Sequence, residues 1–226
     1  MGEVSDPCDV MSAQRNKSLV SAGPLDPRGE RRAERMLDAA VAEFTAKGWR
    51  NTRLDDIVAR SGGSMATLYR AFGNKKGLVH ALIAREAEQL CHGLRALEND
   101  DLPPEEALAS AATGIIDILL KPETLVINLI AVGEGRDVPE IRDLFFQQNV
   151  TPAHQLLRAY LQRQHDAGRL HVPDPVAASN VFFMSLFGDM LFRWISGIDP
   201  APDEAGVRER IPAILSIFIE GLRPRG

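Results

Sequence analysis

The sequence contains only two cysteines, Cys8 and Cys91, among its 226 residues. So few cysteines exclude a disulfide framework and indicate a reducing, cytoplasmic compartment. No apolar run approaches the roughly 18 residues that a membrane-spanning helix needs, because Asp189 and Arg193 interrupt the most apolar stretch, 181–195. The first residues also lack the basic-then-apolar order of a secretory signal. We therefore expect a globular protein of the cytoplasm.

Motifs of catalysis and of phosphate or metal binding are absent as well. The sequence has no glycine-rich phosphate loop, no Gly-x-Ser-x-Gly and no His-Glu-x-x-His, and its five histidines are scattered. Glu88, Cys91 and His92 have spacing that could ligate a metal, but no second cluster joins them, which favours a surface position on a helix. We expect neither an enzyme nor a bound cofactor or metal.

Acidic residues outnumber basic ones, and the net charge is −5. The two signs are unevenly distributed, since residues 28–80 carry a net charge of +5 and residues 81–226 carry −8. A small basic segment is therefore joined to a larger acidic body. This layout is expected when one part of a protein meets nucleic-acid phosphate and the other does not.

Apolar residues recur at helical spacing through almost all of the chain after residue 27. One amphipathic helix carries Met36, Leu37 and Phe44 and is expected to end at Gly48. No stretch alternates with the period of a strand, so we predict an all-α fold, with a kink at Pro152. Later helices are predicted at about 104–120, 123–133, 138–168, 174–197 and 205–222.

The segment from Thr52 to Lys75 predicts a helix-turn-helix. Thr52 resembles an N-cap with Asp55 three residues later, and Ser64 is the expected N-cap of a second short helix, 65–72. Two short helices joined by a glycine turn, after an amphipathic helix, form a trihelical DNA-binding unit. Such a unit places the start of its second helix in the major groove.

Six side chains of this second helix and its cap are candidates for DNA contact. Small residues allow a close approach, whereas Met65 and Thr67 suit a thymine methyl group. Arg70 suits a guanine edge or a phosphate, and the Tyr69 hydroxyl suits a phosphate oxygen; alternatively, Tyr69 is a core aromatic with a solvated tip. The six are Ser64, Met65, Ala66, Thr67, Tyr69 and Arg70, with Thr52 as a further candidate.

Basic residues on both sides of the motif extend the candidate surface. Lys75 and Lys76 follow the expected N-cap Asn74, where the helix dipole disfavours cations but a phosphate could be bound. Arginines at the entrance of the first helix could follow the DNA backbone or enter the minor groove. The alternative for both groups is a solvated basic surface. The arginine candidates are Arg28, Arg31 and Arg32.

The segment from about Arg31 to Leu82, a quarter of the chain, resembles the N-terminal domain of the tetracycline-repressor (TetR) family. The family pattern is helix, Gly, Thr, a short helix and Ser-x-Gly-Thr-Leu-Tyr-x-His-Phe-x-x-Lys. Gly63, Ala66 and Ala71 depart from it; Gly63 is expected to loosen the turn, and the other two to alter the DNA-facing surface. The matching residues are Gly48, Thr52, Ile57, Ser64, Thr67, Leu68, Tyr69, Phe72, Lys75 and Leu78.

The resemblance implies a dimer whose C-terminal helices enclose a ligand cavity and which leaves its operator when a ligand binds. It divides the chain into a disordered arm, 1–27, a TetR-type helix-turn-helix domain, 28–80, and a helical effector-binding and dimerisation domain, 81–226. The last two helices are apolar enough to form a four-helix interface across a two-fold axis, or else they are monomer core. The expected interface residues are Phe182, Leu186, Ile211, Ile214, Leu215 and Phe218.

Polar residues set among large apolar ones are the candidates for effector contact. Asp189 and Arg193 lie one turn apart and are expected to pair, with each other or across the dimer, more readily than with a ligand. The neighbouring methionines and aromatics suit a pocket for an apolar or aromatic small molecule. The candidates are Asn128, Arg136, His154, Phe187, Asp189, Met190 and Trp194.

The sequence therefore predicts a DNA-binding transcriptional regulator, a repressor released from a near-palindromic operator by a small effector. One alternative is a TetR-like activator or a ligand-independent DNA-binding protein with the same basic segment. The other is a helical small-molecule-binding protein or enzyme whose basic segment is incidental. That protein would bind DNA only weakly and without sequence preference.

Overall fold

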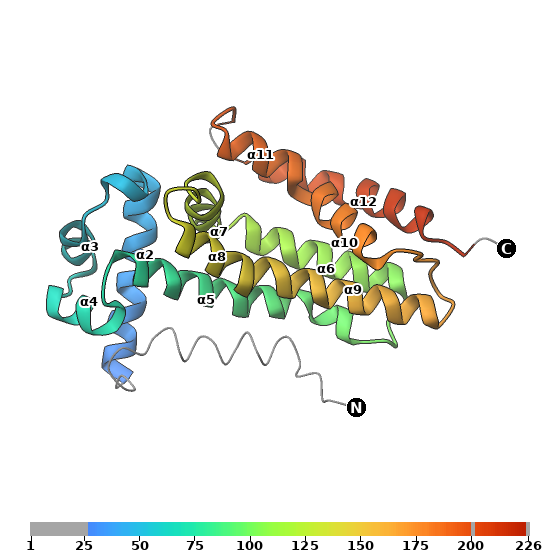
Figure 1. Ribbon diagram of the computed structural model, residues 1–226, viewed down its shortest axis with the longest axis horizontal. Helices are drawn as coiled ribbons and strands as arrows, with labels where there is room; N and C mark the ends of the chain where they lie inside the picture. The colour runs from blue at the N-terminus through green and yellow to red at the C-terminus, as the bar shows by residue number, and fades with distance from the viewer. Residues whose placement is uncertain (1–26, 200–201, 225–226) are drawn as a thin grey trace. The chain divides into compact units, whose positions relative to one another are not determined.

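The computed structural model describes residues 27–199 and 202–224, and within these ranges the regular elements are all helical (Figure 1). The predicted all-α fold is confirmed. The arm predicted for residues 1–27 lies outside the described residues, apart from Pro27. The chain forms two compact units: residues up to Glu88 with Pro122–Gln148, and Gln89–Lys121 with the residues from Asn149 onward.

The first unit begins with a three-helix arrangement. The long helix packs against both short ones through its buried face, which includes Met36, Leu37 and Phe44. Ile57 and Leu68, from the two short helices, are fully buried as well. The helices are α2 (Pro27–Asn51), α3 (Leu54–Ser61), α4 (Met65–Phe72) and the greater part of α5 (Lys75–Leu94).

The predicted end of the first helix at Gly48 is where its backbone leaves helical geometry. Gly48 has φ 75° and ψ 163°, yet a last helical turn follows it as far as Asn51. Glycine adopts a positive φ without the steric cost of a Cβ atom. This break turns the chain so that Trp49 is buried next to Phe44, with 5.5 Å between the ring centroids.

The segment Pro122–Gln148 belongs to the same unit as the N-terminal helices, although the predicted division put everything after residue 80 in one domain. Within this unit α7 packs against α2, and α8 packs against η2. Three acidic side chains of the segment, Glu123, Glu134 and Glu140, form ion pairs with Arg85, Arg50 and Lys76. Its elements are α7 (Pro122–Asn128), the π-helix η2 (Leu129–Gly133), α8 (Pro139–Phe145) and most of the π-helix η3 (Phe146–Val150).

In the second unit α10 packs on α9, and α12 packs on α6. The helix predicted for 138–168 is interrupted at η3, and Pro152 lies directly after it in the first turn of α9, where a missing N–H costs no hydrogen bond. Besides the last turns of α5, the elements are η1 (Arg95–Glu98), α6 (Pro104–Leu119), α9 (Thr151–Asp166), α10 (Pro175–Phe183), the π-helix η4 (Met184–Gly188), α11 (Asp189–Ile195) and α12 (Glu204–Gly221).

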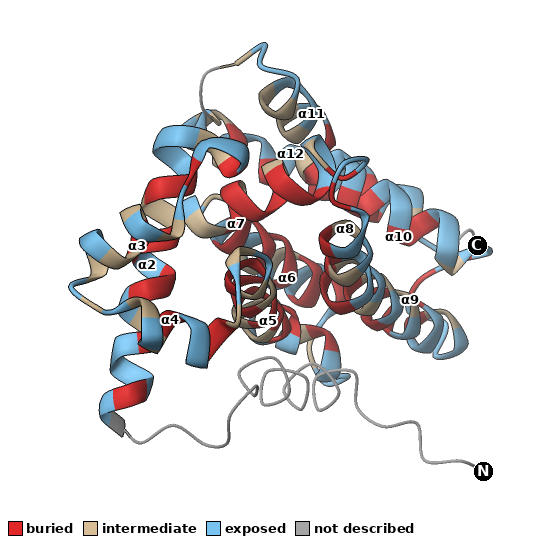
Figure 2. Cartoon of the chain, turned by 60° about the vertical axis from the view of Figure 1, so that its left-hand side comes forward, coloured by how far each residue is buried: buried red, intermediate tan, exposed pale blue. Residues whose placement is uncertain are grey.

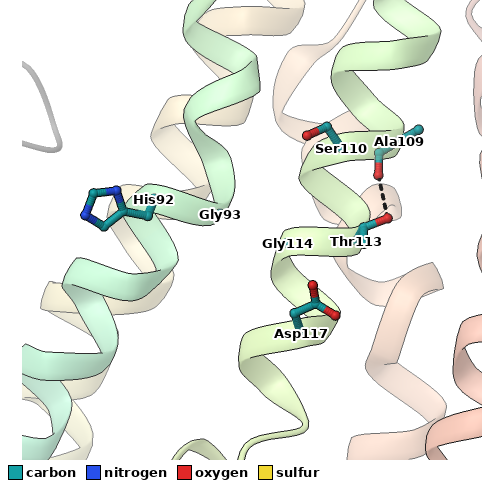
Figure 3. Close-up of a pocket in the computed structure, with 7 residues that line it drawn as sticks. All are labelled: His92, Gly93, Ala109, Ser110, Thr113, Gly114 and Asp117. Atoms are coloured by element: carbon teal, nitrogen blue, oxygen red, sulfur yellow. Dashed lines mark hydrogen bonds between the residues drawn. The ribbon is translucent and has the colours of Figure 1, made fainter.

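Helices α5 and α6 cross at two glycines of the second unit, Gly93 and Gly114. A Cβ atom on Gly114 would lie 2.6 Å from the Gly93 carbonyl oxygen, so the backbones can approach this closely only without side chains. An open groove of about 520 Å³ adjoins the crossing, with exposed polar side chains on both walls (Figure 3). These side chains are His92, Ser110, Thr113 and Asp117.

Large apolar side chains remain exposed on the C-terminal helices, where Figure 2 marks many residues as exposed in pale blue. Val181, Met184 and Phe192 of α10–α11 and Ile217 of α12 are each more than half exposed. Contrary to our expectation, Pro175–Ile195 is long and apolar enough to cross a membrane, by length and composition alone. One such helix is weak evidence for a membrane span, since a helix covered by protein on several faces is equally apolar.

Cys91 is buried in α5 and is disulfide-bonded, whereas the sequence was expected to hold no disulfide framework.

Candidate nucleic-acid interface

Helix α4 has a well-defined start and one outward face. The Ser64 hydroxyl accepts a hydrogen bond from the Thr67 backbone N–H at 3.2 Å, which confirms the predicted N-cap. Leu68 and Phe72 are buried, whereas Tyr69 is 51% exposed and Ala66 and Arg70 are exposed beside it. The alternative of Tyr69 as a core aromatic is therefore wrong. A rigid helix presents Ala66, Tyr69 and Arg70 on one face, at i, i+3 and i+4.

The turn before α4 is tight rather than loose, in contrast to our expectation for Gly63. A Cβ atom at Gly63 would collide with the methyl group of Met36, which is fully buried in α2. Gly62 ends α3 with φ 65°, and the Gly63 N–H donates to the Val58 carbonyl at 3.3 Å. The absence of a side chain at Gly63 thus lets α2 support the turn that positions the start of α4.

Thr52 is a structural residue and not a DNA contact. It is 3% exposed, and its hydroxyl lies 2.8 Å from the Gly48 carbonyl oxygen and 3.1 Å from that of Glu43. The N-cap of α3 is the next residue, Arg53, whose backbone N–H donates to the Asp56 carboxylate. Thr52 therefore stabilises the break at the end of α2 from the inside.

Lys75 also points inward, against our expectation of a phosphate contact. Its ammonium group donates to the carbonyl oxygens of Trp49 at 2.6 Å and Thr52 at 2.9 Å, and it lies 4.5 Å from the centre of the Trp49 ring. Burial lowers the pKa of Lys75. Because two of its three N–H donors have partners, Lys75 clamps the corner between α2 and α3. Asn74 caps α5, as predicted, by accepting from the Gly77 N–H at 3.0 Å.

Lys76 is exposed and pairs with an acidic residue of α8. Its ammonium nitrogen lies 2.7 Å from Glu140 Oε2, and this bond holds the pKa of Glu140 below its usual value. The other carboxylate oxygen of Glu140 lies 3.8 Å from His80 Nε2, and burial lowers the pKa of His80. Sequence reasoning missed the pairing of Lys76 with Glu140 because the two residues lie 64 positions apart along the chain. The cluster of acids between Glu134 and Glu140 was the only signal.

Four arginines occupy the first turns of α2 and line an open pocket of about 410 Å³. All four are exposed, and none forms an ion pair with any residue that the structure describes. They include the three expected from the sequence, and the fourth is Arg35. The four are Arg28, Arg31, Arg32 and Arg35.

Two family models match the chain. The model described as "Bacterial regulatory proteins, tetR family" covers residues 36–82, which contain the helix-turn-helix. The model described as "AefR-like transcriptional repressor, C-terminal domain" covers residues 106–221, more than half of the chain. The chain belongs to the TetR family.

Its relatives are transcriptional regulators rather than enzymes. The regulator YvkB of Bacillus subtilis is 25% identical over 162 residues, which cover 71% of this chain and 82% of YvkB. The transcriptional activator FasR of Mycolicibacterium smegmatis is 30% identical over 119 residues, which cover 53% of this chain and 54% of FasR. The flavonoid-responsive regulator FrrA has a TM-score of 0.64 at 26% identity, covering 87% of this chain and 100% of FrrA. The chain is therefore a DNA-binding transcriptional regulator of the TetR family.

The side chains expected at a TetR-type dimer interface are instead packed inside the second unit. Phe182 and Phe218 contact each other, with 5.2 Å between their ring centroids. The segment Pro175–Ile195 is apolar almost all round and also carries the exposed Val181 and Met184, while Ile217 is exposed on α12. Five of the six are buried, and Ile214 is half-buried; the six are Phe182, Leu186, Ile211, Ile214, Leu215 and Phe218.

The expected effector residues are divided between the two units. Asn128 and Arg136 belong to the first unit, and the others to the second. Asn128 is buried and donates to the Thr124 carbonyl at 2.9 Å, whereas Arg136 is exposed. Arg193 was expected to pair with Asp189, but it pairs with Asp199 at 2.8 Å. Asp189 is exposed, and three others are half-buried: Phe187, Met190 and Trp194.

His154 has the most specific surroundings among the expected effector residues. Its Nδ1 lies 3.0 Å from the hydroxyl of the fully buried Ser179, and its ring lies 4.4 Å from that of Phe183. Burial, followed by the nearby charge of Arg158, lowers the pKa of His154. The cluster therefore favours a neutral imidazole between α9 and α10.

Buried polar groups without a partner were not predicted from the sequence. Both amide atoms of Asn149 and the hydroxyl of Tyr160 have no hydrogen-bond partner among the described residues, although both side chains are buried. Burial raises the pKa of Tyr160 to about 12. Such groups cost free energy unless water or a ligand satisfies them.

Proposed function

We propose that this TetR-family protein is a repressor that binds a near-palindromic operator as a homodimer and leaves it when a small apolar or aromatic effector binds. The observation that carries the DNA-binding part is the outward face of α4, with Tyr69 and Arg70 held on a helix whose other face is buried. Helices docked in this way read base edges and phosphates in the major groove. A cytoplasmic location follows from a DNA partner.

The homodimer is supported by the exposed apolar side chains of the second unit. Val181, Met184 and Ile217 are 54%, 63% and 76% exposed on elements that pack together, since η4 contacts both α10 and α12, and exposed apolar surface is typical of an interface between proteins. Isologous contact of two identical surfaces creates a two-fold axis. Two recognition helices related by that axis would read the two halves of a near-palindromic site.

The effector part is supported by the cluster of His154, Ser179 and Phe183 in the second unit. An aromatic wall beside a neutral imidazole and a hydroxyl suits a mainly apolar ligand with one or two polar groups. The relative FrrA is named for its response to flavonoids, which are aromatic molecules of this kind. An effector changes the affinity of the protein for DNA by the same factor by which DNA changes its affinity for the effector.

A transcriptional activator is the second candidate, because the relative FasR is one. Repression and activation use the same DNA-binding helices, so the structure of α4 fits both. Transcription in vitro from a template that carries the operator separates them, since a repressor lowers and an activator raises the amount of transcript.

The decisive experiment is a binding titration with DNA. Purified protein is titrated at about 150 mM salt against the DNA flanking its own gene, duplexes selected from a randomised library, and an unrelated duplex. We expect affinity for the best duplex to be on the order of a thousandfold tighter than for the unrelated one. Tyr69→Ala with Arg70→Ala should abolish this preference, whereas Arg95→Ala on η1 should retain it. Equal, weak affinity of the wild type for all duplexes would contradict the proposal.

The effector is tested by thermal unfolding with quercetin as a flavonoid and octanoate as an aliphatic acid. A ligand that prefers the folded state raises the melting temperature, and a true effector must also weaken operator binding. A ligand that raises the melting temperature without affecting DNA binding would contradict the release mechanism and favour a ligand-independent DNA-binding protein.

A further inference from the structure

Four arginines share one side of α2 at its beginning. Arg28, Arg31, Arg32 and Arg35 lie at i, i+3, i+4 and i+7, the spacing of a single helix face. Among the residues that the structure describes, these four line an open pocket of about 410 Å³. We call these four residues the arginine face.

The charge of the arginine face is not neutralised by the described protein. None of its guanidinium groups forms an ion pair among residues 27–199 and 202–224. Of the nearby acids, Glu30 is exposed in the first turn of α2, whereas Glu34 and Asp38 accept hydrogen bonds from Arg85 of α5, at 2.8 Å and 3.3 Å. Arg28 in the first turn also opposes the helix dipole, and the four positive charges repel one another, so an external anion would relieve an unfavourable arrangement.

The arginine face lies close to the start of the DNA-reading helix. Met36 follows Arg35 directly, and its side chain packs against Gly63, the residue before the N-cap Ser64 of α4. Figure 1 shows the N-terminal turns of α2 beside α4 within the first unit. The uncompensated positive charge therefore stands at the edge of the surface that presents Tyr69 and Arg70.

We propose that the arginine face binds the phosphate backbone of duplex DNA outside the base pairs that α4 reads, so that the operator includes flanking DNA. This inference rests on the proposed DNA-binding function. Guanidinium groups match phosphate oxygens in a two-pronged geometry and stay charged at all physiological pH values. Phosphate contacts of this kind add affinity and fix the register of the protein without reading sequence.

The test uses the duplex selected by the wild-type protein in two lengths. The short duplex is trimmed to the minimal selected core, and the long one carries about eight more base pairs on each side, roughly 27 Å of helix. Binding is measured by fluorescence anisotropy over a series of salt concentrations. The variant is Arg31→Gln with Arg35→Gln, and the matched control is Arg95→Gln with Arg223→Gln, two exposed arginines of the second unit.

The wild type and the control are expected to bind the long duplex more tightly than the short one. The arginine-face variant should lose this preference, and its slope of log K against log salt on the long duplex should fall by about 0.9 for each lost phosphate contact, close to 1.8 per protomer. On the short duplex, variant and wild type should bind alike.

Three results would overturn the inference. The first is a wild type that binds both lengths equally, and the second is a variant that keeps the preference and the slope. The third is a variant with unchanged DNA binding that has lost binding of free tripolyphosphate, which would make the arginine face a site for small anions. Failure of the proposed function is recognised separately, because the wild type would then select no duplex at all.

Discussion

Lys75 and Lys76 are adjacent residues whose ammonium groups have different partners. Lys75 is held by two backbone carbonyls at the corner of α2 and α3, whereas Lys76 reaches Glu140 from an exposed position. A lysine that clamps a corner affects DNA binding through the geometry of α4. A lysine that binds phosphate acts through the release of counterions, which depends on salt. The two roles are therefore distinguishable.

Replacing Lys75 should impair the fold, and replacing Lys76 should impair only the contact with DNA. Lys75→Met is expected to lower the free energy of unfolding by about 1–3 kcal/mol, because it removes hydrogen bonds from a charged group, and to weaken operator binding without changing its salt slope. Lys76→Met should change stability by less than about 0.5 kcal/mol and reduce the slope by about 0.9 per protomer. Urea unfolding and anisotropy measure the two quantities. A reduced slope with unchanged stability for Lys75→Met would instead assign that lysine to a phosphate.

His80 and His154 should make stability depend on pH. Burial lowers the pKa of each ring below its ordinary value of 6.5, so the unfolded chain binds these protons at a higher pH than the folded protein does. Their contribution is complete above pH 6.5 and is lost as the pH falls. We expect the free energy of unfolding to decrease from about pH 7.5 to about pH 5.5, a range in which most carboxylates stay ionised.

Histidine variants test the origin of this pH dependence. Replacing both rings, by His80→Gln with His154→Gln, should flatten the stability profile over that range. The exposed His92 provides the control, since His92→Gln should leave the profile as it is. A profile that the double variant does not alter would refute the assignment.

For single residues, the sequence predicted the features that depend on neighbouring positions in the chain. The cap at Ser64 and the outward position of Tyr69 follow from helix periodicity and from the chemistry of a short hydroxyl side chain. The partners of Lys75 could not be predicted, because Trp49 and Thr52 are more than 20 residues away and approach only when α2 breaks at Gly48. Thr52 resembled an N-cap because the capping residue is its neighbour, Arg53.

At the scale of elements, the turn between α3 and α4 depends on a missing side chain. Gly63 has no unusual φ, so its role is the space that Met36 occupies. Gly63→Ala is expected to lower the free energy of unfolding by about 1 kcal/mol, at the low end for overpacking, because the atom it meets is the end of the flexible Met36 side chain. Combining it with Met36→Leu should recover part of this loss, as a non-additive pair. Chemical denaturation of the two single variants and the double variant measures the coupling.

A second glycine serves as the control for this prediction. Gly221 ends α12, and a Cβ atom there would meet nothing within 4 Å. Gly221→Ala should therefore leave stability unchanged or raise it slightly, because alanine restricts the unfolded chain. Additive effects of Gly63→Ala and Met36→Leu would show that the two side chains do not compete for space.

Most helix boundaries could be predicted, because proline, glycine and capping residues mark them in the sequence. The π-helical segments η2, η3 and η4 could not, since one extra residue per turn leaves no clear pattern in apolar spacing. The segment predicted as one helix over 138–168 therefore consists of α8, η3 and α9.

At the scale of the whole molecule, the exposed apolar side chains of α10–α12 should control assembly. Val181→Glu with Ile217→Glu is expected to convert a dimer into a monomer, because two charges would be buried in an apolar interface. The monomer should lose most of its operator affinity. Sedimentation velocity and the DNA titration measure both effects, and Val132→Glu, an exposed apolar residue of the first unit, is the control. A folded double variant that remains dimeric would place the interface elsewhere.

The sequence did not show which side chains of these helices are buried and which are exposed. Helix 175–195 is apolar almost all round, so periodicity alone does not distinguish Phe182 and Leu186 from Val181 and Met184. Packing against α9 and α12 decides which side is buried. The buried side of the helix is therefore set by the arrangement of helices in the folded unit.

The unit that contains the DNA-reading helices is discontinuous in sequence, which limits its modularity. The chain leaves this unit after Glu88 and returns at Pro122 with the acids that pair with Arg50, Lys76 and Arg85. A chimaera that joins residues 1–80 to the body of another regulator would separate Arg50 and Lys76 from these acids and would lose Arg85. Exchanging operator specificity between relatives therefore requires the transfer of two stretches of sequence, of which the second supports the fold of the first.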